Sequence, residues 1–117
     1  MIHVFCGKRG SGKTKALINM ANDSVKETKG SVVYIDDDKK RMYDVDSKVR
    51  FIAAEDFDVK DYKCFYGFLC GIISEDYDIE SIFIDGLFSI VHGDISNAAH
   101  LFSDLEKLSQ KFNVEFF

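Results

Sequence analysis

Eight residues near the N-terminus have the types and spacing of a loop that binds phosphate. They match the pattern in which one glycine and four intervening residues are followed by Gly-Lys and then Ser or Thr. Glycine allows backbone shapes in which successive N–H groups surround a phosphate. We expect Lys13 to contact the β- and γ-phosphates of a nucleotide, and the Thr14 hydroxyl to bind Mg²⁺. The expected phosphate-binding residues are Gly7, Lys8, Arg9, Gly10, Ser11, Gly12, Lys13 and Thr14.

An aspartate at the end of an apolar stretch is the second candidate for chemistry. A site for Mg²⁺ and a nucleotide needs a carboxylate at the end of a neighbouring strand. Asp85 follows the apolar stretch 81–84 and is therefore the expected second ligand of Mg²⁺. Asp36 also ends an apolar stretch and is the runner-up. For residues 36–38 the alternative is a solvent-exposed turn.

The cysteines and histidines do not have the spacing of a metal site. There are three of each, with no Cys-x-x-Cys pair, and a zinc site needs about four ligands. We expect the cysteines to be reduced and to pack as small buried apolar side chains. Two of the histidines, His92 and His100, are expected at the surface or on a helix. The full set is Cys6, Cys64, Cys70, His3, His92 and His100.

Two further groups of residues have a structural and a functional interpretation. The basic run 39–41 is expected to be a solvated loop, and the alternative is contact with a phosphate or a neighbouring subunit. Four phenylalanines are expected in the core rather than in a platform for base stacking. They are Phe65, Phe68, Phe102 and Phe112.

Apolar stretches alternate with amphipathic ones along the chain, and these elements must position the candidate residues. Strands are expected over 2–6, 31–35, 49–54, 82–84 and 114–117, and helices from 13 to before 30, over 61–74, and over 96–111 with Ser96 as the cap. Residues 39–48 are expected to be a loop or a short helical turn. This order predicts a three-layer α/β/α sandwich with a mainly parallel sheet of about five strands. Ligands of such sheets bind at the carboxyl ends of the strands.

Length and composition limit the class of protein. A chain of 117 residues, 46% apolar and 30% charged, is expected to form one domain over 1–117. The last expected strand reaches Phe117, which leaves open a native chain that continues past this residue. A net charge of −5 argues against a general nucleic-acid or anionic-membrane binder. Short apolar runs and the lack of a signal-peptide pattern predict a cytoplasmic protein without a membrane span. A protein partner or a homo-oligomer remains open.

On residues 7–14 and 81–85, the sequence resembles the P-loop nucleoside-triphosphatase superfamily. The alternating pattern is similar to a trimmed RecA-like or thymidine-kinase-like core. More closely, the chain resembles short bacterial ATP-binding proteins that are often labelled as related to the twitching-motility ATPase. The resemblance implies ATP binding with Mg²⁺ at Thr14 and Asp85.

The sequence also departs from that superfamily. Hydrolytic RecA-like members usually carry Glu directly after the Asp, and here that position is Gly86. The chain has no Asn-Lys-x-Asp motif, no arginine-rich lid and no cysteine-rich zinc lobe. We therefore expect ATP binding with slow hydrolysis at most, and no catalytic residue is identified. The alternatives are a nucleotide-dependent switch or assembly module, a small-molecule phosphotransferase, and a domain that keeps the loop without binding nucleotide.

Overall fold

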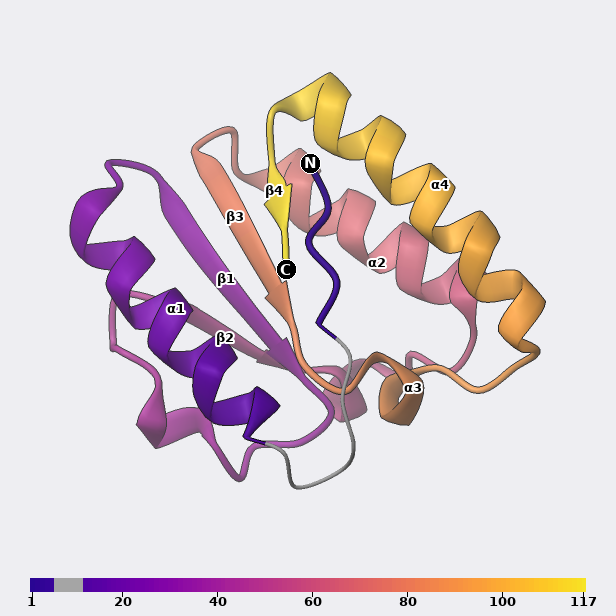
Figure 1. The fold of residues 1–117 in the computed structure, drawn as a ribbon, viewed down its shortest axis with the longest axis horizontal. Coiled ribbons are helices and arrows are strands. Elements are labelled where there is room, and N and C mark those ends of the chain that lie inside the picture. Colours follow the sequence, from indigo (N-terminus) through magenta and orange to yellow (C-terminus); the bar gives the residue numbers. More distant parts are fainter. Residues whose placement is uncertain (6–11) are drawn as a thin grey trace.

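The computed structural model describes residues 1–5 and 12–117. Its sheet has four strands in the order β2-β1-β3-β4, and every neighbouring pair is parallel (Figure 1). The strands are β1 (Ser31–Asp36), β2 (Arg50–Ala53), β3 (Ile79–Ile84) and β4 (Glu115–Phe116). The expected α/β class with a parallel sheet is confirmed.

Helices cover both faces of the sheet. They are α1 (Lys13–Glu27), α2 (Tyr62–Glu75), the short α3 (Leu87–Ile90) and α4 (Ile95–Phe112), with 3₁₀ turns η1 (Met42–Asp44) and η2 (Ala54–Phe57). Along β1, Val32 and Tyr34 belong to the core on the α1 side, whereas Val33 and Ile35 belong to the core under α2 and α4. Side chains alternate between the two faces of a strand, so this apolar strand supplies both cores.

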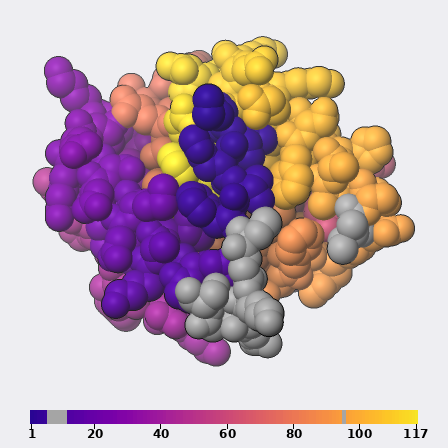
Figure 2. Space-filling view, in the orientation of Figure 1, coloured from indigo at the N-terminus to yellow at the C-terminus, as the bar shows by residue number. Residues whose placement is uncertain are grey.

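The fifth expected strand, over 2–6, is not confirmed in the described part of the chain. Ile2 makes one isolated parallel bridge with Phe116, and the His3 N–H donates to the Phe116 carbonyl at 2.8 Å. Cys6 lies outside the described residues. The N-terminal segment nevertheless lies along β4, and Figure 2 shows it in indigo between α1 and the yellow C-terminal part of the chain. The amino group of Met1 also donates to Ser109 Oγ on α4.

Two helices begin at aspartate caps. The Asp61 carboxylate accepts a hydrogen bond from the Cys64 N–H at 2.8 Å and caps α2. Asp94 precedes α4, and its carboxylate accepts from the Ser96 N–H at 3.5 Å. The expectation that Ser96 is the cap is wrong, because α4 begins one residue before Ser96 and the capping carboxylate lies two residues before it.

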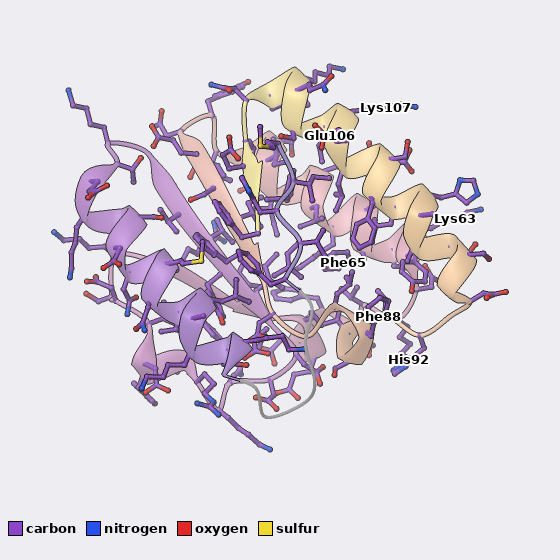
Figure 3. The ribbon with its side chains drawn as sticks, in the orientation of Figure 1. Lys63, Phe65, Phe88, His92, Glu106 and Lys107 are labelled. Carbon is purple, nitrogen blue, oxygen red and sulfur yellow. The ribbon has the colours of Figure 1, made fainter. Side chains whose placement is uncertain are left out.

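Only some of the side chains that were expected in the core are buried. Phe65 is fully buried, and Figure 3 shows it between the sheet and α4. Phe68 and Phe102 are half-buried, whereas Phe112 is 46% exposed at the end of α4. Cys64 is also exposed, on the first turn of α2. The core assignment is therefore wrong for Phe112 and for Cys64.

In the part of the chain that the structure describes, no helix is both long enough and apolar enough to cross a membrane.

Candidate functional site

The start of α1 carries the end of the phosphate-loop motif. Gly12 precedes the helix with φ of 86°, a left-handed backbone that favours glycine. Lys13 and Thr14 are the first two helical residues, and both are half-buried. The first N–H groups of a helix have no partner within the helix, and together with the helix dipole they attract anions. Residues 7–11 of the motif lie outside the described residues.

Lys13 and Asp85 line the same cavity. Its volume is about 420 Å³, and it lies between the N-terminal segment, the end of β3, α3 and α4. In Figure 1 the first turn of α1, the tips of β1 and β3, and α3 all lie in the lower half of the molecule. The rest of the lining is mainly apolar and includes Val4, Phe5, Leu87, Phe88, Phe102 and Leu105. The fold thus brings together two expected site residues that are distant in the sequence.

Asp85 is held through both its side chain and its backbone. Asp85 follows β3, is only 9% exposed, and its Oδ2 accepts a hydrogen bond from the Tyr34 hydroxyl at 2.9 Å. Its backbone N–H donates to the Ile35 carbonyl at 2.8 Å. Burial, and then the charge of Asp85, raise the pKa of Tyr34 well above its usual range. Tyr34 therefore remains a protonated donor to Asp85 at neutral pH.

Asp36 lies at the end of β1, next to the end of β3. Burial raises the pKa of Asp36 to about 6, helped by the charges of Asp85, Asp38 and Asp37 and opposed by a hydrogen bond from the Asp37 N–H. That N–H lies 2.7 Å from Asp36 Oδ1. Asp36, Asp37 and Asp38 are all half-buried. Asp36 therefore lies within electrostatic reach of Asp85, and its choice between a metal ligand and a solvent-exposed turn residue stays a prediction.

Thr14, Asp36 and Asp85 carry oxygen donors, and of these three only Asp85 lines the cavity. Mg²⁺ prefers oxygen ligands, keeps several waters, and usually takes one or two protein groups together with phosphate oxygens. Thr14 and Asp85 offer a hydroxyl and a carboxylate of this kind, and Asp36 offers a second carboxylate. Among residues 1–5 and 12–117, no three His, Cys, Asp or Glu residues gather as a metal site. A Mg²⁺ ion here would depend on nucleotide phosphates for its remaining ligands.

The residue after Asp85 has a conformational role. Gly86 has φ of 69° and precedes α3, and the Ser89 N–H donates to its carbonyl at 2.8 Å. Because the left-handed backbone disfavours residues with a side chain, this position is better suited to glycine than to glutamate. The chain therefore turns sharply at Gly86, directly after Asp85.

The basic run after β1 forms pairs with nearby carboxylates. Lys39 Nζ lies 3.0 Å from Asp56 Oδ2, and Arg41 Nη1 lies 4.0 Å from Asp44 Oδ2. All three basic side chains of 39–41 are exposed, as expected for a solvated loop. Exposed pairs of this kind stabilise a fold by ~0–1 kcal/mol. The exposure of residues 39–41 therefore agrees with the expected solvated loop.

The two histidines expected at the surface line a different cavity from Lys13 and Asp85. His92 and His100 are exposed, as expected, and Figure 3 shows His92 after α3. Tyr34 is the residue that sequence reasoning missed. Alternation along β1 places Tyr34 two residues before Asp36, but its partner Asp85 is 51 positions away. Only the pairing of β1 with β3 brings the two side chains together.

Comparison of the chain with protein-family models found no match, and comparison with curated proteins also found none.

Proposed function

We propose that this protein binds a nucleoside triphosphate, ATP in the first instance, together with Mg²⁺ at the carboxyl edge of its sheet. The observation that carries the proposal is the shared cavity of Lys13 and Asp85. The first belongs to a complete phosphate-loop pattern at the start of a helix, and the second ends the strand β3. A phosphate loop and a strand-end carboxylate are the two parts that hold Mg²⁺ and a nucleotide in P-loop proteins.

Each residue has a distinct role in this proposal. The Lys13 ammonium meets the negative charge of the β- and γ-phosphates, and the first N–H groups of α1 face the same anion. Thr14 and Asp85 supply oxygen ligands to Mg²⁺, with Asp36 as the runner-up. The chain carries a net charge of −5, so an anion must be bound by such a local concentration of donors.

Binding is better supported than turnover. Hydrolysis requires a group that orients or activates water, in addition to the parts that hold the phosphates. Gly86 has no side chain, and Asp85 is assigned to the metal. We therefore propose ATP binding with slow hydrolysis at most.

The test is the thermal stability of Lys13→Ala with and without ATP and Mg²⁺. A ligand at 100 times its Kd stabilises the native state by about 2.7 kcal/mol, so wild type should melt at a higher temperature when the ligand is present. Lys13→Ala keeps a good helix former at this position and should lose that increase. Lys15→Ala, which changes an exposed lysine of the same helix, is the control and should keep the increase. Equal stabilisation of wild type and Lys13→Ala would contradict the proposal.

A nucleotide-dependent switch or assembly module is the second candidate, and it is favoured by apolar side chains around the cavity. Val4 is 59% exposed, Phe5 47% and Phe88 59%, and all three line the cavity that Lys13 and Asp85 share. A cluster of exposed apolar side chains is typical of a contact surface. Light scattering after gel filtration should then show a larger assembly with ATP and Mg²⁺ than without them. An unchanged mass would argue against the switch but not against binding.

A further inference from the structure

We infer that Tyr34 is a positioning residue for Mg²⁺: its hydroxyl holds the Asp85 carboxylate so that one carboxylate oxygen is left for the metal. This inference rests on the proposed function, because it assigns a role to a residue that supports the expected Mg²⁺ ligand.

The ring of Tyr34 is fixed by its neighbours in the sheet. It stacks against Phe51 of β2 with centroids 5.9 Å apart, and against Phe83 of β3 with centroids 6.3 Å apart. The plane of each phenylalanine ring is within 15° of parallel to the plane of the Tyr34 ring. Phe51 and Phe83 are also the direct partners of Tyr34 in the parallel register. A ring between two aromatic neighbours in paired strands has little freedom to move, so the position of its hydroxyl is defined.

The hydroxyl uses this fixed position to orient a buried carboxylate. Tyr34 is fully buried and Asp85 nearly so, and the Tyr34 hydroxyl donates to Asp85 Oδ2 at 2.9 Å. In such surroundings a hydrogen bond to a charged acceptor is stronger than one between neutral groups. The bond engages one lone pair of Oδ2, so in this inference Oδ1 is the oxygen that binds the metal. It also helps to offset the cost of burying the carboxylate charge.

In this arrangement Tyr34 is the hydrogen-bond partner of Asp85, the proposed metal ligand. Hydrogen-bond partners of metal-binding carboxylates fix the orientation of the ligand, and their loss typically lowers metal affinity by about 10–100-fold. Tyr34→Phe removes the hydroxyl and keeps the stacked ring. We therefore expect this variant to bind ATP in EDTA as wild type does, and to lose about 10–100-fold in affinity for Mg²⁺ in the presence of ATP.

The experiment is calorimetric titration of wild type and variants with ATP in EDTA, and with Mg²⁺ at saturating ATP. Tyr62→Phe is the control, because Tyr62 is a buried tyrosine on α2, which covers the other face of the sheet. It should keep the Mg²⁺ affinity of wild type. Asp85→Asn should weaken Mg²⁺ binding, and adding Tyr34→Phe to it should cause no further loss, because Tyr34 acts through Asp85. A merely structural role for Tyr34 would instead add its own loss in the double variant.

The failure of the inference can be told apart from the failure of the proposed function. If wild type binds no ATP, the proposed function is wrong. If wild type binds ATP and Mg²⁺ and Tyr34→Phe binds both equally well, only the role of Tyr34 is wrong. If Tyr34→Phe does not fold, the role of Tyr34 is tested by NMR on wild-type protein that carries isotope-labelled tyrosine. The resonances of Tyr34 should then shift with ATP and Mg²⁺ but not with ATP in EDTA, and an unchanged spectrum would overturn the inference.

Discussion

Replacing Asp36 by Asn should stabilise the folded protein at neutral pH. The pKa of Asp36 is about 6 in the fold against 3.8 as the reference value, because burial and the charges of Asp85 and Asp38 disfavour the ionised form. The native state therefore holds this proton more tightly than the unfolded state. It follows that the contribution of Asp36 to the free energy of unfolding falls as pH rises from about 4 to about 6, and then stays level.

The magnitude follows from the size of the shift. A change of about two pKa units corresponds to about 3 kcal/mol at 1.36 kcal/mol per unit, and solvent screening of a half-buried group reduces this to about 1–2 kcal/mol. The backbone hydrogen bond from Asp37 to Asp36 Oδ1 can be kept by the amide oxygen of Asn. Asp36→Asn should therefore be more stable than wild type by about 1–2 kcal/mol at pH 7, which is a rise in Tm of roughly 4–10 °C for a domain of this size.

Denaturation by urea, followed by circular dichroism over pH 4–8, measures this difference; the chain has no tryptophan to report by fluorescence. The difference between Asp36→Asn and wild type should shrink as pH falls from 7 towards 4. Asp23→Asn, which changes an exposed carboxylate on α1, is the control and should stay within about 0.5 kcal/mol of wild type. If Asp36→Asn is no more stable than wild type at pH 7, or if its gain does not depend on pH, the electrostatic reasoning is wrong.

Three other predictions concern turnover and local structure. The isolated protein should hydrolyse ATP at ~10⁻⁴ to 10⁻² s⁻¹ in a phosphate-release assay, and a rate above about 1 s⁻¹ would reveal a catalytic group, with Asp36 the first to replace. Gly86→Ala should lower the free energy of unfolding by about 1–2 kcal/mol in urea, because φ at this residue is 69°; an unchanged midpoint would show that the turn adapts without strain. Asp61→Ala should lower the urea midpoint in the same assay through loss of the α2 cap, whereas Asp61→Asn should lower it less.

The sequence predicts the layers of the fold because the two periodicities are strong. Val32 to Ile35 form an apolar strand buried on both faces, and α4 repeats its buried leucines at helical spacing at 101, 105 and 108. The same spacing places Phe112 on the buried side of α4, yet this residue ends the helix and is 46% exposed. Periodicity shows which side of a helix is apolar, but it does not show where the neighbouring elements end.

Short elements are harder to predict because contacts rather than local pattern decide them. β4 has two residues, and the N-terminal segment forms a single bridge with it through Ile2. Asp94 caps α4 in place of the expected Ser96, and both residue types are good caps. A shift of two residues in the start of a helix changes which side chain reaches the free N–H groups.

Two residues of the candidate site could be predicted from the sequence, but the hydrogen-bond partner of Asp85 could not. The motif and the strand end identified Lys13 and Asp85, and the structure gives them one cavity. The hydrogen bond from Tyr34 to Asp85 joins two strands that are adjacent only in the folded sheet. No pattern within either strand alone predicts the contact between Tyr34 and Asp85.

The most direct test of the central proposal is a calorimetric titration of the wild-type protein with ATP in the presence of Mg²⁺. The proposal predicts one saturable site per chain, with a Kd below about 1 mM, that is lost in Lys13→Ala and kept in Lys15→Ala; Kd values in that range correspond to more than about 4 kcal/mol of binding free energy. Absence of heat and of saturation for wild type at millimolar ATP would contradict it, and so would equal affinity in Lys13→Ala.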